Sequence, residues 1–334
     1  MEPVRLGIIG VGWVAQVIHF PILIKLPDVK IVSLSDVNKS RAHLVGEKYG
    51  IKNIYSDVHA MLQSVDISAV LICTPTDTHL DLVLACLAAG KDVLVEKPIA
   101  RSYKEAVQMA DAARDAKRNL MVGMNLRFRP DTMLLKSFIE GKELGNIFYA
   151  SIGWLTKRQS DSKWAMKKEK AGGGVFMDIG NVLLDMALWM MGYPNVTRVK
   201  ANHFKQKAKQ VEDTSLVTLT LSNGAVIRIE SSWSLCLQDE IYYGHFYGPE
   251  GTASLNPLRI HRERYGNVVN LAPAKMDSPQ AMFKRSYENE LKHFLAAVQG
   301  IHPLISTADE AIHRMRIVEA VYKSARLGKE IVIT

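Results

Sequence analysis

A glycine turn placed directly after an apolar segment is the feature that most constrains the fold. Residues 4–10 form an apolar run ending in Gly10, as expected of a strand buried on both faces. Residues 13–26 follow with apolar positions at helical spacing. A strand, a glycine turn and a helix in this order are typical of a nucleotide-binding unit.

The alternation of strand and helix continues to residue 123. Ser56 and Ser102 are the expected N-caps of two of the helices, and Gly90 stands where a C-terminal glycine belongs. This order predicts a Rossmann-type, doubly wound parallel sheet over residues 1–123. The expected strands are 31–36, 67–73, 92–96 and 120–123, and the expected helices are 39–49, 57–63, 77–89 and 103–117.

After residue 123 the pattern changes to strands that follow one another. Asn223-Gly224 between two of them is a strong hairpin signal. We therefore predict an α+β domain over residues 124–334, with a large, mostly antiparallel sheet that serves substrate binding and oligomerisation, and with last helices that pack back toward the first domain. Its expected strands are 146–155, 196–204, 214–221, 225–234, 241–248 and 252–256, and its helices are 130–140, 175–191, 282–299 and 307–327, the last capped by Ser306 or Thr307.

Composition excludes several classes of protein. The 334 residues are 48% hydrophobic and 23% charged, which is ordinary for a globular chain. No stretch approaches 18 uncharged apolar residues and no secretory signal opens the chain, so we expect a cytoplasmic protein with no membrane partner. The three cysteines, Cys73, Cys86 and Cys236, are too few and too scattered for a disulfide framework or a zinc site, and no metal is expected.

The chain carries a net charge of +8. Its basic residues are mostly spread out, whereas nucleic-acid binding would require them clustered on a known module, so we expect no nucleic-acid partner. The excess charge indicates either a basic soluble protein or one with an anionic ligand.

The glycine turn has the residues that a dinucleotide-binding loop needs. Gly10 permits the tight turn, Gly12 lets the backbone approach a pyrophosphate, and the small Ala15 allows the helix to pack closely on the strand. The helix N-terminus favours the anion. Gly10, Gly12, Trp13 and Val14 are therefore candidate cofactor-binding residues.

Asp36 ends the second expected strand, about 20 residues after the turn, where such a loop places an acidic residue. A carboxylate there accepts hydrogen bonds from the adenine ribose hydroxyls and repels a 2′-phosphate, so we expect NAD(H) as the preferred cofactor. Lys39 and Arg41 lie nearby and could soften this preference, so NADP(H) is not excluded. We favour solvated helix charge as the interpretation of both.

Further motifs make a family resemblance specific. The segment from Cys73 to His79 reads CTPTDTH after a strand, and the segment from Gly90 to Pro98 reads GKDVLVEKP. A strand ending in T-P-x-x-x-H, then a helix, then G-K-x-V-x-x-E-K-P resembles the glucose–fructose oxidoreductase / inositol dehydrogenase (Gfo/Idh/MocA) family of NAD(P)-dependent oxidoreductases. The resemblance covers essentially the whole chain. It includes residues 122–128, Gly172-Gly173-Gly174, Asp178, Gly180, Asp185 and the last helix with Gly328-Lys329-Glu330.

The resemblance implies a set of site residues. Lys97 is attractive on its own terms as well, because it follows the carboxyl end of a strand, where open α/β sheets bind ligands, and a lysine there can transfer a proton. Lys97 and Asp178 are the catalytic candidates. The resemblance further implies that Thr74, Pro75, Thr76 and His79 line the cofactor, that Glu96 and Lys97 lie beside the nicotinamide, and that Asn125, Trp164 and Tyr287 approach cofactor or substrate.

The chain departs from the family at one important position. Relatives usually carry a histidine four residues after the aspartate, and here that residue is Val182, which cannot transfer a proton. The neighbouring Asn181 can hydrogen-bond but is no acid or base near neutral pH, and it is a candidate substrate residue. Three alternatives follow. Lys97 acts alone, the chain binds cofactor without turnover, or a sheet residue fills the gap, namely Tyr242, Tyr243 or His245.

One segment concentrates basic charge. Residues 154–171 hold six basic and two acidic side chains and lead into the glycine turn at 172–174. This segment either attracts an anionic substrate or forms a solvated loop.

Arg127, the other candidate substrate residue, and Arg129 could clamp a carboxylate or phosphate or form structural ion pairs. Trp154 and Trp164 could stack on a sugar or belong to the core.

These observations together predict an NAD-dependent oxidoreductase that acts on a secondary alcohol or ketone of a sugar, polyol or sugar derivative. The alternatives are a non-catalytic dinucleotide-binding regulator and an NAD-assisted glycoside-cleaving enzyme. Strands 214–221 and 225–234 mix apolar residues on both faces and therefore need cover on the second side. With the resemblance, this predicts a homodimer or homotetramer.

Overall fold

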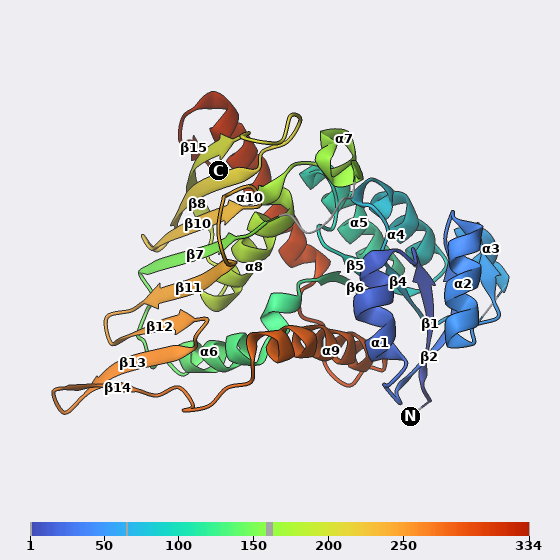
Figure 1. Cartoon of the computed structure of the whole chain (residues 1–334), viewed down its shortest axis with the longest axis horizontal. Coiled ribbons are helices and arrows are strands. Elements are labelled where there is room, and N and C mark those ends of the chain that lie inside the picture. The colour runs from blue at the N-terminus through green and yellow to red at the C-terminus, as the bar shows by residue number, and fades with distance from the viewer. Residues whose placement is uncertain (1, 65, 158–162, 334) are drawn as a thin grey trace. The chain divides into compact units, whose positions relative to one another are not determined.

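The computed structural model describes residues 2–64, 66–157 and 163–333. The chain folds into two compact units (Figure 1). Unit 1 comprises Met1–Asn125 and Tyr287–His313, and unit 2 comprises Leu126–Ser286 and Arg314–Thr334. The two long helices at the end of the chain, α9 (Pro279–Val298) and α10 (Ala308–Leu327), each contribute residues to both units.

Unit 1 is built on a parallel six-stranded sheet of order β3-β2-β1-β4-β5-β6. Because β1 lies between β2 and β4, the strand order reverses there, and open α/β sheets bind ligands at the carboxyl ends of strands beside such a switch. This confirms the predicted parallel sheet. Its strands are β1 (Val4–Ile9), β2 (Val29–Ser35), β3 (Ile54–Tyr55), β4 (Ala69–Ile72), β5 (Asp92–Glu96) and β6 (Leu120–Gly123), and its helices include α2 (Lys39–Tyr49), α3 (Val58–Ser64), α4 (His79–Ala88) and α5 (Tyr103–Ala116).

Side-chain capping hydrogen bonds explain several helix starts, and the structure corrects two of the sequence predictions. Ser102 accepts from the Glu105 N–H as predicted, and Thr307 forms a reciprocal capping box with Glu310. Ser56 is not a cap, because Asp57 instead accepts from the N–H of His59. The helix predicted over 13–26 contains a π-helical segment η1 (Ala15–His19) before α1 (Phe20–Leu23), and the α-helix ends earlier than predicted.

Unit 2 contains a nine-stranded sheet of order β14-β13-β12-β11-β7-β10-β9-β8-β15. All neighbouring strands are antiparallel except β7 and β10, so the predicted mostly antiparallel sheet is confirmed. The polar hairpin of β13 and β14 at one edge was not predicted, because its sequence lacks apolar alternation. The strands are β7 (Tyr149–Leu155), β8 (Val196–Phe204), β9 (Thr214–Leu221), β10 (Val226–Ser232), β11 (Ile241–Tyr247), β12 (Gly251–Leu255), β13 (Arg259–Arg264), β14 (Asn267–Asn270) and β15 (Ile331–Val332).

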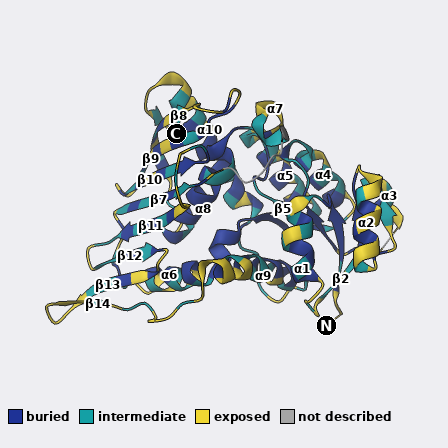
Figure 2. Cartoon of the chain, in the orientation of Figure 1, coloured by how far each residue is buried: buried dark blue, intermediate teal, exposed yellow. Residues whose placement is uncertain are grey.

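One helix lies almost entirely within the core of unit 2. A π-helical segment η5 (Phe176–Gly180) leads into α8 (Asn181–Met190), whose residues are buried apart from the half-buried Trp189 (Figure 2). The stretch Lys168–Met190 is long and apolar enough to cross a membrane, but 83% of its most apolar window is buried within the protein, as in the core helix of a soluble protein. Shorter helices of this unit are α6 (Pro130–Glu140) and α7 (Lys168–Ala171).

Candidate active site

The glycine turn of unit 1 is shaped by contact with the end of β4. Gly10 has φ +85°, and an added Cβ would lie 2.7 Å from the Thr74 methyl group and 2.9 Å from the Cys73 carbonyl. An added Cβ at Gly12 would meet no described heavy atom within 4 Å. The protein's own packing therefore requires glycine at Gly10, whereas at Gly12 it leaves open space that a bound pyrophosphate can approach.

Asp36 holds this turn from the end of β2. Its carboxylate accepts from the backbone N–H of Val11 (2.9 Å) and of Asn38 (2.8 Å). Burial alone would raise the pKa of Asp36, but hydrogen bonds from Arg41, Asn38 and Val11 outweigh it and lower the pKa. Arg41 is not the solvated helix charge that the sequence led us to favour, because its guanidinium forms an ion pair with Asp36 at 2.7 Å.

His79 joins the loops that follow β4 and β5. Its Nε2 lies 2.9 Å from the carbonyl oxygen of Thr74, and its Nδ1 lies 3.0 Å from that of Pro98. The ring is buried, and burial lowers its pKa. Both ring nitrogens thus face backbone carbonyls, so His79 orders the segment that carries Thr74, Pro75 and Thr76.

A pair between the buried His19 and the half-buried Glu96 was missed from the sequence. His19 Nε2 lies 2.7 Å from Glu96 Oε1, and the second oxygen of Glu96 accepts from the Lys97 N–H at 3.2 Å. Burial would raise the pKa of Glu96, but His19 and Lys97 outweigh it and lower the pKa. Tyr287 packs its ring edge against His19, with 5.8 Å between centroids. His19 therefore connects the helix after the glycine turn to the strand end that carries Lys97.

In unit 2, the helix of η5 and α8 presents the other candidates. Asp178 lies in the π-helical segment, and its N–H donates to the carbonyl oxygen of Gly174. Val182 is buried at 4% exposure. Asn181 is 1% exposed, and its Oδ1 has no hydrogen-bond partner among the residues that the structure describes. A buried amide oxygen without a partner is costly, which makes Asn181 a candidate to receive a ligand hydroxyl.

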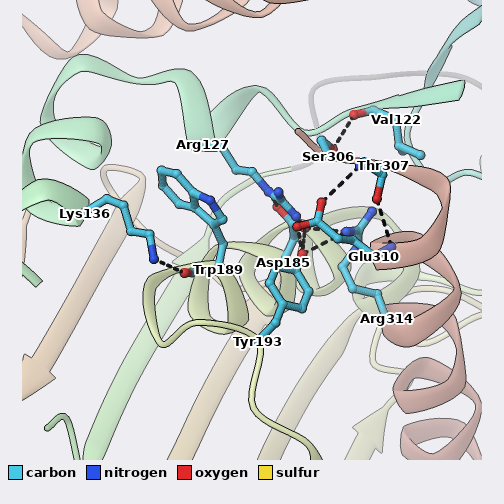
Figure 3. Close-up of polar contacts among 10 residues, drawn as sticks. All are labelled: Val122, Arg127, Lys136, Asp185, Trp189, Tyr193, Ser306, Thr307, Glu310 and Arg314. Carbon is cyan, nitrogen blue, oxygen red and sulfur yellow. Dashed lines mark hydrogen bonds and ion pairs between the residues drawn. The ribbon is translucent and has the colours of Figure 1, made fainter. Parts of the chain in front are cut away.

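Asp185, further along α8, lies at the centre of a buried ion-pair cluster (Figure 3). Its carboxylate pairs with Arg127 and Arg314, each at 2.6 Å, and accepts from the Tyr193 hydroxyl at 2.7 Å. Burial would raise the pKa of Asp185, but the two arginines outweigh it and lower the pKa. Arg127 is 1% exposed, so its charge serves an ion pair, which was one of the two alternatives from the sequence. Arg129 likewise pairs with Asp131.

Only one of the sheet residues proposed to replace the missing histidine lies on the face of β11 that packs against α8. The hydroxyl of Tyr242 contacts the sulfur of Met186 on α8, so Tyr242 is on the helix side and is buried there. Tyr243 and His245 are on the opposite side of β11, where side chains alternate. Tyr243 and His245 therefore cannot fill the gap at Val182, and the suggestion is wrong for both.

The remaining candidates lie on separate elements. Asn125 ends the first segment of unit 1 and is buried, and Trp164 lies in the 3-10 helix η4 (Lys163–Met166) of unit 2. Trp154 on β7 packs against Tyr242, with 5.6 Å between ring centroids. Arg158 and Asp161 of the basic segment lie outside the described residues. Within the described ranges, no group of three or more His, Cys, Asp or Glu side chains could hold a metal ion.

Comparison with known proteins is consistent across the chain. Residues 4–124 match a family model described as "Oxidoreductase family, NAD-binding Rossmann fold", and residues 136–333 match "Oxidoreductase family, C-terminal alpha/beta domain". The chain is 30% identical over 348 residues to D-glucoside 3-dehydrogenase of Escherichia coli (strain K12), covering 99% of this chain and 97% of the relative. It is 30% identical over 318 residues to myo-inositol 2-dehydrogenase of Thermotoga maritima, covering 91% of each. A solved structure of GenD2 from gentamicin A biosynthesis in complex with NAD matches with a TM-score of 0.87 at 25% identity, covering 100% of this chain and 97% of that one.

The His19–Glu96 pair generates a prediction about stability and pH. His19→Leu leaves one oxygen of the half-buried Glu96 carboxyl without its side-chain partner, and we expect a loss of about 1–3 kcal/mol in the free energy of unfolding at neutral pH. Because the folded pKa of Glu96 is lowered, its ionised form stabilises the protein above the unfolded value, and this contribution is lost as pH falls through the folded pKa. Urea unfolding should therefore show the difference from wild type shrinking in acid. The exposed His59→Leu serves as control, and a pH-independent difference would contradict this account.

Proposed function

The chain belongs to the Gfo/Idh/MocA oxidoreductase family, whose two domain models together span most of its length, and from this we propose that it is an NAD-dependent dehydrogenase of a sugar, polyol or sugar derivative. Hydride passes between nicotinamide and a carbon that bears a secondary hydroxyl or keto group. The observation that carries the proposal is in unit 1. There, open space at Gly12, the Asp36 carboxylate and Lys97 all lie at carboxyl ends of parallel strands.

The residues of unit 1 fit a dinucleotide. The turn Gly10-Val11-Gly12 with Trp13 and Val14 receives the pyrophosphate at a helix N-terminus, and Trp13 is 70% exposed and available for contact. Asp36 receives the adenine ribose hydroxyls. Bound NAD supplies the hydride acceptor.

Lys97 is the proposed general acid/base. As the substrate carbon is oxidised, the hydroxyl proton must leave, and the Nζ of Lys97 accepts it; in the reverse direction Nζ returns it to the carbonyl oxygen. Glu96 holds the Lys97 backbone through the N–H contact, and His19 holds Glu96. The backbone at Lys97 is therefore fixed by its hydrogen bond to Glu96, whose carboxylate is in turn held by His19.

Asp178 orients a substrate hydroxyl, and Asn181 offers its buried oxygen to a second hydroxyl. Val182 provides no acid or base, so proton transfer depends on Lys97 more heavily than in relatives that keep a histidine there. Asn125, Trp164 and Tyr287 complete the proposed contacts with cofactor and substrate.

We further propose that the substrate carries negative charge. Met166 and Ala208 belong to one hydrophobic cluster, and this packing brings the end of the basic segment beside the loop after β8. Both segments present exposed lysines to solvent, and such a concentration of one charge attracts anions. The described lysines are Lys167, Lys168, Lys170, Lys205, Lys207 and Lys209.

We place the enzyme in the cytoplasm, because Cys73 and Cys86 are free and buried.

The function is tested by measuring NADH formation with sugars and polyols offered in pairs, each pair consisting of a neutral compound and its acidic derivative. We expect turnover of at least one compound. At low salt, the acidic compound of that pair should be oxidised faster than the neutral one. Lys97→Met should lower kcat by about 10²–10⁴-fold, because a positioned acid/base contributes that much, and should leave the dissociation constant of NAD nearly unchanged.

Lys91→Met is the matched control, since Lys91 precedes the same strand at its opposite end. If the protein binds NAD but turns over none of the substrates, the alternative of a non-catalytic dinucleotide-binding regulator would be favoured. Full activity of Lys97→Met would refute the proposed acid/base.

Cofactor choice is tested at the pair of Asp36 and Arg41. Asp36→Ser removes the charge that repels a 2′-phosphate and releases Arg41 to bind one, so the preference for NAD over NADP should fall at least about tenfold. Adding Arg41→Ala should restore part of the preference. Titration of both cofactors measures this, and equal binding of NAD and NADP by the wild type would contradict it.

We propose that the second face of the nine-stranded sheet is covered by another copy of the chain. Leu216 and Ile241 are 41% and 43% exposed there, and the same face carries the stacked rings of Tyr149 and Tyr247. Exposed apolar surface on such a face marks an interface. Light scattering should give a dimer or tetramer for the wild type and a smaller species for Leu216→Arg with Ile241→Arg. Leu44→Arg, on the exposed side of α2, should change nothing.

A further inference from the structure

The helix that carries Asp178 begins in a turn that is held from outside the helix. Three successive backbone N–H groups of this turn donate to a single residue, Glu212, which precedes β9. Gly174 and Phe176 donate to its side-chain Oε1 at 2.9 and 3.1 Å, and Val175 donates to its main-chain oxygen at 2.9 Å. Since the first N–H groups of a helix have no partner within the helix, Glu212 supplies an acceptor that the local sequence does not.

Tyr322, on α10, fixes the position of that acceptor. Its hydroxyl donates to Glu212 Oε1 at 2.6 Å. Burial is the larger cause and the charge of Glu212 the next largest cause that raise the pKa of Tyr322, so the hydroxyl keeps its proton. The ring packs edge-on against Phe176 and His203, with centroids 6.4 and 5.0 Å away. Tyr322 therefore contacts both the turn and the residue that caps it.

The close approach of these two residues explains the glycine-rich turn. An added Cβ at Gly174 would overlap the main-chain oxygen of Glu212, and one at Gly173 would overlap the hydroxyl of Tyr322. Neither glycine has a positive φ, so the requirement here is space and not backbone conformation. The turn is built of glycine because Glu212 and Tyr322 press against it.

We propose that Glu212 and Tyr322 are positioning residues for Asp178, which lies two residues after the last N–H that Glu212 accepts. This inference rests on the proposed function for the role of Asp178. Together the two side chains fix where the helix begins and therefore where the Asp178 carboxylate stands. Neither needs to touch substrate or cofactor.

The test uses Tyr322→Phe, which removes only the hydroxyl, in the full-length protein. We expect amide hydrogen exchange at residues 174–178 to become at least about fivefold faster, because the turn loses a partner of its cap. We expect kcat to fall about tenfold with the dissociation constant of NAD unchanged, since misplacing a reacting group by about 1 Å can cost 100-fold. Glu212→Ala should have the larger effect, and Glu212→Gln, which keeps an acceptor oxygen, should recover most of the activity.

A double-mutant cycle separates positioning from general support of the fold. In an Asp178→Asn background, Tyr322→Phe should lower kcat no further, because both changes act through one group. The matched control is Ser324→Ala on the same helix, which loses bonds to Ala201 N and the Lys329 carbonyl but does not touch the turn. It should leave both kcat and exchange at residues 174–178 unchanged.

Three results would overturn the proposal: unchanged exchange at residues 174–178 in Tyr322→Phe, an additive loss of kcat in the double mutant, or an equal loss in Ser324→Ala. The exchange measurement needs no substrate, so its failure counts against Glu212 and Tyr322 alone. If exchange responds but Asp178→Asn keeps the wild-type kcat, the proposed role of Asp178 is wrong, and the positioning role falls with it.

Discussion

Two helices of this protein begin after a glycine turn, and in both a carboxyl group from another segment accepts N–H groups that the turn leaves unpaired. Asp36 accepts from Val11 in unit 1, and Glu212 accepts from Gly174 and Phe176 in unit 2. The first N–H groups of any helix lack an internal acceptor, so each needs a partner when it is buried. Glu212 accepts the first N–H groups of its helix and so fixes where that helix begins, whereas Asp36 fixes the turn just before its helix. The candidate residues on each helix depend on these contacts.

Buried charges connect the rest of each unit in the same way. Glu96 joins His19 to the backbone of Lys97, and Asp185 joins α8 to Arg127 and Arg314. Removing one member of such a pair leaves a charge without compensation in a buried place, which is strongly destabilising. These pairs therefore specify which segments meet, and they place the proposed acid/base and the helix with Asp178 on rigid supports.

Elements with a strong local signal were predicted well. Helix 39–49 and strand 92–96 appear with the predicted bounds, because capping and apolar runs act over a few residues. The failures were of two kinds. Some were choices between near neighbours: Asp57 and not Ser56 caps α3, and Arg41 pairs with Asp36, five residues before it. Others depended on distant residues. His19 and Glu212 carried no local signal, since each gains its role from a partner at least 36 residues away.

The sequence by itself determined the parallel sheet, the glycine turn with Asp36, the strand end at Lys97 and the family, because each of these is recognised from residue types and their spacing along the chain. Only the tertiary structure decided that Arg127 serves a buried ion pair, that Tyr243 and His245 face away from α8, and that Gly173 and Gly174 make room for Tyr322 and Glu212. These outcomes depend on which side chains meet after the chain has folded, and burial then makes an unpaired charge or an extra methyl group too costly to retain.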